Sequence, residues 1–218
     1  MRRVVGFLVL VVLPVPLVVG FGGAPSAPAK LPAIFCGGRL ATIASNAGTI
    51  FGTEADDVIV AVGSNPHTVR ALGGNDVVCG GTGADAIYGG EGRDRIDGRQ
   101  GDDRIDGGAG DDVLYGNNGK DTLIGGDGRD YLFGLNGNDV ASGETGDDVI
   151  LGGDGDDVLA GGAGTDAIYG GPGRDTVVAD DPEDFAFDDE PAGLGVEVSG
   201  GASVRKSSVG RESNTRAS

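Results

Sequence analysis

The sequence predicts an all-β fold in which short strands wind into a solenoid of stacked, parallel coils. Three observations predict it. A nine-residue pattern runs without insertion from residue 71 to residue 178, Gly and Asp hold fixed places in every repeat, and one aliphatic residue follows each fixed Asp. A repeat of nine residues is too short to bury a core by itself, so successive repeats must stack on one another.

The twelve repeats show which positions hold the same residue throughout and which positions vary. They are ALGGNDVVC, GGTGADAIY, GGEGRDRID, GRQGDDRID, GGAGDDVLY, GNNGKDTLI, GGDGRDYLF, GLNGNDVAS, GETGDDVIL, GGDGDDVLA, GGAGTDAIY and GGPGRDTVV. The fourth position is Gly and the sixth is Asp in all twelve, and the first is Gly in eleven. The second is Gly in only seven and is therefore interpreted as tolerant. The eighth is Val, Ile or Leu except at Ala141.

Each repeat divides into a strand and a turn. The segment x-aliphatic-x predicts a three-residue strand with only the eighth position facing inward. The segment G-G-x-G-x-D predicts a turn whose glycines need positive φ or close backbone approach. Two repeats then make one coil of 18 residues, with odd-numbered repeats in one parallel sheet and even-numbered repeats in the other. The aliphatic residues expected between the sheets are Val78, Ile87, Ile96, Ile105, Leu114, Leu123, Leu132, Ile150, Leu159, Ile168 and Val177.

The charge of the chain predicts that its ligands are cations. The 34 acidic and 16 basic residues give a net charge of −18, which disfavours nucleic acid and anionic membrane surfaces as partners. Residues 71–178 alone hold 22 acidic and 7 basic residues, and stacking places one acidic turn over another. One buried aliphatic side chain per repeat is too little to offset this repulsion together with the ordering of nine backbone residues. The stack is therefore expected to need a bound cation.

The repeats also carry a family resemblance. GGTGADAIY, GGEGRDRID and GGAGDDVLY resemble the hemolysin-type calcium-binding repeat, the nonapeptide of secreted bacterial RTX proteins, and the resemblance covers 108 contiguous residues. It implies a parallel β-roll, a right-handed β-solenoid, with Ca²⁺ held between the turns of repeats n and n+2 by Asp carboxylates and turn carbonyls. Twelve repeats would give at most about ten such ions. The metal ligands that the resemblance implies are Asp76, Asp85, Asp94, Asp103, Asp112, Asp121, Asp130, Asp139, Asp148, Asp157, Asp166 and Asp175.

The chemistry of the repeats agrees with calcium. Ca²⁺ takes six to eight oxygen ligands, which carboxylates and the carbonyls of glycine-rich turns supply, whereas Mg²⁺ demands tighter octahedral geometry. The turns hold neither His nor thiol, which argues against zinc and copper. The alternative is that the aspartates only cap the turns, as Asp often does. Twelve equivalent acidic places in so acidic a chain favour the metal.

The N-terminal segment predicts export. Residues 1–29 read as a signal peptide, with Arg2 and Arg3 as its basic start and Ala27-Pro28-Ala29 as its exit. A membrane anchor is the alternative, but the apolar run has only 16 residues and contains two prolines, whereas a spanning helix needs about 20 apolar residues. A secreted, extracellular protein is therefore expected.

Residues 30–70 are interpreted as an N-terminal cap with one degenerate repeat, GTEADDVIV, followed by a loop at 61–70. His67, the only histidine, is expected on the surface of this loop. Cys36 and Cys79 both lie in the exported part, so a disulfide is favoured over two separately buried thiols.

The nine-residue period is expected to stop after Val178. Residues 179–218 are interpreted as an acidic cap, in which Phe185 and Phe187 alternate with other residues, followed by a disordered tail from residue 199.

The predicted function is an exported calcium-binding repeat protein that folds on binding calcium. No G-x-S-x-G or H-E-x-x-H motif occurs, so no catalytic activity is expected. The alternative function is a structural or adhesive extracellular protein whose calcium-rigidified rod binds a protein or cell-surface partner through an apolar outer face. Tyr115, Tyr131, Phe133 and Tyr169 line up on that face, where they equally fit a simpler role in stabilising adjacent strands.

Overall fold

The computed structural model describes residues 33–179, 184–188, 197–200 and 203–206. The predicted signal peptide, residues 1–29, lies outside these ranges. All regular secondary structure in the described residues is β, and within them no helix is long and apolar enough to cross a membrane.

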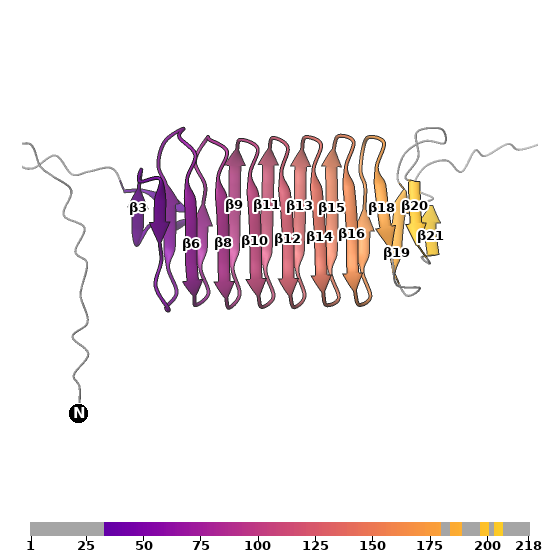
Figure 1. Cartoon of the computed structure of the whole chain (residues 1–218), viewed down its shortest axis with the longest axis horizontal. Helices are drawn as coiled ribbons and strands as arrows, with labels where there is room; N and C mark the ends of the chain where they lie inside the picture. Colours follow the sequence, from indigo (N-terminus) through magenta and orange to yellow (C-terminus); the bar gives the residue numbers. More distant parts are fainter. Residues whose placement is uncertain (1–32, 180–183, 189–196, 201–202, 207–218) are drawn as a thin grey trace, which may run out of the picture. The chain divides into compact units, whose positions relative to one another are not determined.

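Successive strands of the described residues alternate between two parallel sheets (Figure 1). The nine-stranded sheet contains β4 (Thr49–Phe51), β6 (Thr68–Gly73), β8 (Ala86–Glu91), β10 (Arg104–Ala109), β12 (Thr122–Asp127), β14 (Val140–Thr145), β16 (Val158–Ala163), β18 (Thr176–Ala179) and β20 (Glu197–Gly200). The ten-stranded sheet contains β3 (Ile43–Ser45), β5 (Val58–Ala61), β7 (Val77–Cys79), β9 (Arg95–Gln100), β11 (Val113–Asn118), β13 (Tyr131–Asn136), β15 (Val149–Asp154), β17 (Ala167–Tyr169), β19 (Phe185–Asp188) and β21 (Ser203–Lys206). The predicted parallel β-roll is confirmed.

The pairing register is that of an 18-residue coil. Leu114 on β11 pairs with Ile96 on β9 and with Leu132 on β13, each 18 residues away. Odd-numbered repeats therefore supply one sheet and even-numbered repeats the other, as predicted. The offset is 19 residues where the pairing spans one extra residue, as between Val58 and Val77, and 16 residues between β3 and β5.

The strands are longer than the predicted three residues. From β8 to β16 each strand has six residues and consists of x-aliphatic-x from one repeat with G-G-x from the next, as in Arg95–Gln100. Both Ile96 and Gly98 are buried in this strand, so the prediction that only the eighth position faces inward is wrong. The first glycine continues the strand and turns inward, which shortens the turn to G-x-D.

A single file of aliphatic side chains fills the space between the sheets. All eleven residues predicted for this core are fully buried, and Ala141 occupies the twelfth place. The same file extends beyond the predicted repeats to Ile50, Ile59 and Val69 at one end and to Ala186 at the other. The core is thus a line one side chain wide.

The winding continues past both predicted limits. Residues 61–70 are not only a loop, because Thr68–Arg70 begin β6 and Val69 enters the core. The expectation that the period stops at Val178 is wrong for residues 184–188, where β19 pairs with β17. Of the predicted disordered tail, the structure describes two strand segments, β21 and the end of β20, and the rest lies outside the described residues.

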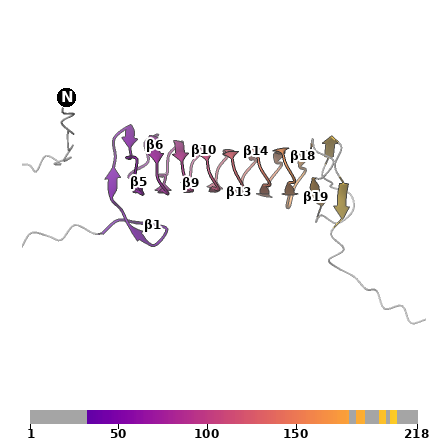
Figure 2. The ribbon, with the colours of Figure 1, turned by 90° about the horizontal axis from the view of Figure 1, so that it is seen from below.

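A small hairpin covers the outer face of the ten-stranded sheet near its first coils. It consists of β1 (Phe35–Cys36) and β2 (Arg39–Leu40), and Figure 2 shows β1 outside the coils beside β5. The predicted disulfide is confirmed, because Cys36 bonds to Cys79 at the end of β7. A second apolar cluster surrounds this bond and contains Cys36, Val58, Val60, Val77 and Cys79.

Candidate metal centre

All twelve predicted ligand residues are buried, and each exposes 3% or less of its surface. The structure sorts them into two columns, one along each edge of the sheets where the turns lie (Figure 1). The Asp76 column precedes the ten-stranded sheet and contains Asp76, Asp94, Asp112, Asp130, Asp148 and Asp166. The Asp85 column precedes the nine-stranded sheet and contains Asp85, Asp103, Asp121, Asp139, Asp157 and Asp175. Residues 18 apart therefore become neighbours, whereas residues nine apart lie on opposite edges.

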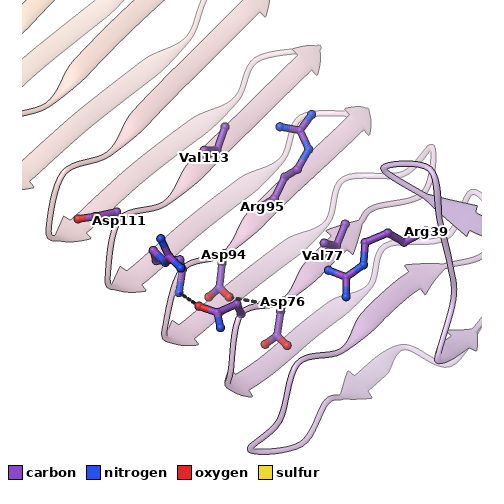
Figure 3. Close-up of a pocket in the computed structure, with 9 residues that line it drawn as sticks. Arg39, Asp76, Val77, Asp94, Arg95, Asp111 and Val113 are labelled. Carbon is purple, nitrogen blue, oxygen red and sulfur yellow. Dashed lines mark hydrogen bonds between the residues drawn. The ribbon is translucent and has the colours of Figure 1, made fainter.

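One oxygen of each carboxylate binds the turn before it. The main-chain N–H of Asp76 donates to Asp94 Oδ1 at 2.8 Å, and that of Asp94 donates to Asp112 Oδ1 at 2.7 Å. Figure 3 shows the first of these bonds beside an open pocket of about 310 Å³, which Arg39 and Arg95 also line. The same bond recurs along both columns, so the aspartates do cap turns.

The second carboxylate oxygen, Oδ2, has no hydrogen-bond partner in most aspartates of the two columns. Within the described residues, Oδ2 is buried and has no hydrogen-bond partner in Asp76, Asp94, Asp103, Asp112, Asp121, Asp130, Asp139, Asp148, Asp157 and Asp166. A buried carboxylate oxygen without a donor is expensive, and it is rare in folded proteins. Turn capping therefore accounts for Oδ1 of these carboxylates, but it gives no role to Oδ2.

Burial makes these groups reluctant to ionise. It is the largest cause that raises the pKa of Asp112 to about 8, and the neighbouring carboxylates of Asp94 and Asp130 raise it further against the lowering effect of the Asp94 N–H. Burial likewise raises the pKa of Asp103 and of Asp157 to about 7. A positive charge at these oxygens would reverse the effect.

The glycine at the first position leaves no room for a side chain beside the free oxygen. A Cβ on Gly98 would lie 2.5 Å from Asp103 Oδ2 and 3.1 Å from the carbonyl oxygen of Gly116. A carboxylate oxygen of one coil and a main-chain oxygen of the next thus converge on the place that any larger residue would fill.

Main-chain oxygens must complete any ion site here. Within the part of the chain that the structure describes, no group of three or more His, Cys, Asp or Glu side chains is arranged to hold a metal ion. Of the common metals, Ca²⁺ is the one that takes backbone carbonyls together with one or two carboxylates. The donor set therefore fits calcium and does not fit zinc.

His67 occupies the place of an aspartate at the start of the Asp85 column. It is 2% exposed, its N–H donates to Asp85 Oδ1 at 2.7 Å, and its Nδ1 lies 3.0 Å from the same oxygen. The expectation of a surface histidine is therefore wrong. A shift of the repeat frame by one residue at Ala61 finds it, because VGSNPHTVR then has His67 at the sixth position and Val69 at the eighth.

Two further aspartates extend the Asp76 column. Asp57 precedes β5, and Asp184 precedes β19 and accepts the N–H of Asp166 at 3.1 Å. Asp57 was visible at the sixth position of the degenerate repeat, and Asp184 appears when the frame is continued past Val178.

The fifth position adds a second ladder that the sequence analysis did not identify. Asp102 Oδ1 accepts the N–H of Lys120 at 2.9 Å, and Asn138 Oδ1 accepts the N–H of Asp156 at 3.1 Å. These side chains are exposed and cap the fifth residue of the next turn. Asp or Asn recurs at this position in half of the repeats, which is the signal for it.

The second position is not conformationally tolerant. In five repeats a residue other than glycine has φ between 76° and 83°, in the left-handed region, at Leu72, Arg99, Asn117, Leu135 and Glu144. In eleven of the twelve repeats the second position has positive φ, whether glycine or another residue occupies it, and the exception is Gly81. The side chains point away from the core, which is why sequence varies there.

The comparison with known families agrees with this geometry. The chain matches the RTX calcium-binding nonapeptide repeat in six overlapping segments, at residues 68–87, 80–114, 88–123, 106–141, 115–150 and 142–177. A comparison with functionally curated protein sequences gives no match. Together the six segments cover half of the 218 residues, and the chain belongs to the RTX calcium-binding nonapeptide repeat family.

Proposed function

We propose that this calcium-binding repeat protein holds Ca²⁺ between stacked turns along both edges of its solenoid, and that the repeats fold when the ion binds. The ligands in this proposal are the aspartates of the two columns together with carbonyls of the glycine turns. The observation that carries it is the buried Oδ2 of Asp103 beside the Gly116 carbonyl, repeated coil after coil. The proposal assigns the chain no catalytic role.

Coupling between binding and folding follows from electrostatics. The carboxylates of a column are buried next to one another, and their mutual repulsion adds to the desolvation that raises the pKa of Asp112. A divalent cation supplies positive charge where the protein offers only acceptors. An interaction that exists only in the wound state stabilises that state, so removal of the ion unwinds it.

Export is the second part of the proposal. The bond between Cys36 and Cys79 supports it, because structural disulfides persist in oxidising compartments outside the cell. Extracellular calcium modules bind at about 10⁻⁴ to 10⁻³ M, so the chain would stay unwound in a calcium-poor interior and fold after export.

Calorimetric titration of the purified chain with calcium tests the ligand assignment, with Asp112→Asn and Asp111→Asn as a matched pair. Both variants remove one negative charge from adjacent residues, but Asp112 is buried in the column and Asp111 is exposed and caps Arg129. We expect Asp112→Asn to bind fewer ions and Asp111→Asn to bind as many as the original chain. Equal titrations for both variants would remove Asp112 from the ligand set.

A second candidate function is partner binding through the outer face of the ten-stranded sheet. Tyr115 and Phe133 stack there with ring centroids 4.9 Å apart, while Tyr131 and Tyr169 are 41% and 37% exposed. The stacking alone fits strand stabilisation. A calcium-dependent partner that is captured by the original chain and not by a Tyr131→Lys variant of equal stability would favour this candidate.

A further inference from the structure

Two turns near the N-terminus differ from the rest at their second position. In the other repeats this residue has positive φ, whereas Thr53 and Gly81 do not. Their N–H groups instead reach the carboxylate at the sixth position of the same repeat. Thr53 N–H donates to Asp57 Oδ2 at 2.8 Å, and Gly81 N–H donates to Asp85 Oδ2 at 2.7 Å.

The carboxylate of Asp57 is satisfied by the protein at both oxygens. The Thr53 hydroxyl donates to Oδ2 at 2.9 Å in addition to the Thr53 N–H. The Thr42 hydroxyl lies 3.0 Å from Oδ1, and it also accepts the N–H of Val58 at 2.9 Å. Both oxygens of this carboxylate therefore already accept hydrogen bonds from the protein.

Asp85 is satisfied in the same way with His67 as its partner. Oδ1 receives the N–H and lies near Nδ1 of His67, and Oδ2 receives the N–H of Gly81. A histidine in place of an aspartate therefore supplies a donor where every later coil supplies only another carboxylate. Neither Asp85 nor His67 offers the free carboxylate oxygen that is repeated from Asp94 to Asp166.

The same end of the molecule carries the other features that stabilise a fold without metal. The disulfide joins Cys36 of the hairpin to Cys79, the residue directly before Gly80. The second apolar cluster lies beneath the hairpin, and β5 contributes four consecutive buried residues instead of an alternating pattern. Within this block only Asp76 retains a buried Oδ2 without a partner.

We propose that residues 33–88 form a calcium-independent N-terminal block, in which Asp57 and Asp85 are not calcium ligands, and on which calcium orders the later coils. This inference rests on the proposed function, because it divides the coils into those that need calcium and those that do not. The φ of the residue at the second position distinguishes the two kinds of aspartate. Where φ is not positive, the N–H of that residue donates to Oδ2 of the aspartate in the same repeat, and where φ is positive, Oδ2 stays free. The block gives the later coils a fixed edge of strands to extend, which removes the nucleation step from calcium-driven winding.

Hydrogen exchange on the metal-free full-length chain tests the block directly. We expect amides in residues 53–61 and 81–88 to exchange at least about 100-fold more slowly than those in residues 103–160. With saturating calcium both regions should be protected. A His67→Ala variant should lose the protection of residues 81–88 in the metal-free chain, and a His67→Asn variant, which keeps a side-chain donor, should retain part of it.

Calcium counting tests the ligand assignment with two charge-matched variants. We expect Asp85→Asn to bind as many ions at saturation as the original chain and Asp103→Asn, one coil further along the same column, to bind at least one fewer. Equal loss in both variants, or rapid exchange of residues 53–61 and 81–88 in the metal-free chain, would overturn the inference while calcium binding by the original chain still supports the proposed function. An original chain that binds no calcium overturns both.

Discussion

The main-chain N–H of Asp112 donates to Oδ1 of Asp130 at 2.8 Å across 18 residues of sequence. This bond joins two successive coils at their turns and uses one carboxylate oxygen inside the protein. The other oxygen of Asp130 is buried without a donor. Each coil therefore makes its hydrogen bond to the preceding turn, but the negative charge of its carboxylate is not balanced.

Removal of calcium should unwind most of the chain. We expect the β signal in far-ultraviolet circular dichroism to fall when the metal is removed by a chelator and to return when calcium is added in excess. Each site at ten times its dissociation constant stabilises the wound state by about 1.4 kcal/mol, so several sites together dominate the stability. Magnesium at the same concentration is the control, and an unchanged spectrum without metal would contradict the coupling.

Acidification should partly replace the metal. Burial raises the pKa of Asp112 to about 8 and of Asp94 to about 6 in the folded state, from an ordinary value of 3.8. An acid with a raised pKa binds more protons when folded, so its contribution to stability is present below pH 3.8 and is lost as the pH rises through 6 to 8.

The corresponding measurement is circular dichroism of the dialysed, metal-free chain between pH 8 and pH 4. We expect β structure to increase as the pH falls, and the calcium affinity of the chain to decrease over the same range because protons and metal compete for the carboxylates. Loss of structure on acidification would show that these groups are ionised in the folded, metal-free chain.

Truncation of one core residue should destabilise the calcium-bound protein strongly. Leu132 is fully buried in a core one side chain wide, so Leu132→Ala leaves a gap that no second layer can fill. We expect the free energy of unfolding by denaturant, in saturating calcium, to fall by about 2–5 kcal/mol. Val158→Ala is the control, because Val158 is 44% exposed and its truncation should change stability by about 0.5 kcal/mol or less.

Glycine at a second position should stabilise the protein. Leu135 has φ of 81° and is 37% exposed, so Leu135→Gly relieves an unfavourable backbone conformation and gives up a side chain that is only partly buried. We expect a gain of about 1 kcal/mol in the same denaturation experiment. The reverse change one coil later, Gly153→Ala at φ of 112°, should destabilise because its Cβ would meet the carbonyl of Leu135. A loss of stability in Leu135→Gly would show that the side chain contributes more than the backbone strain removes.

The ladder at the fifth position should contribute independently of calcium. Asn138 carries no charge and its Oδ1 accepts the N–H of Asp156 at 3.1 Å. Asn138→Ala should lower the free energy of unfolding by about 0.5–1.5 kcal/mol without changing the number of ions bound. Asn138→Asp, which keeps the acceptor, should be close to the original chain, and an equal loss in both variants would argue against the cap.

The regular part of the fold follows from the repeat pattern. A fixed Asp, a fixed Gly and one aliphatic position in register predict the 18-residue coil, the two sheets and the buried file that includes Leu114 and Leu132. The repeat pattern does not predict the strand length, because glycine at the first and second positions is typical of a turn. In the structure these glycines continue the ladder, since the inward glycine makes room beside the carboxylate of Asp103.

The ends of the fold are predicted less well, because the repeats there depart from the nine-residue pattern although they adopt the same coil. A one-residue insertion at Ala61 hides the repeat that contains His67, and the substitution of imidazole for carboxylate removes the signal that identifies the other repeats. Oδ2 accepts a hydrogen bond from its own turn in Asp85 and has no partner in Asp103. This difference depends on the backbone φ of the residue at the second position. Glycine occupies this position at both Gly81 and Gly108, but only Gly108 has positive φ, so the sequence does not distinguish the two conformations.

The 18-residue register has a consequence for how such a chain changes over evolutionary time. Leu114 contacts its counterparts one coil away on either side, and no strand of the central coils pairs with anything more distant in the stack. Excision or duplication of a pair of repeats therefore rejoins surfaces that already match. Length is an adjustable property of this architecture, because adding or removing one coil changes the number of contacts between coils without requiring a new kind of contact.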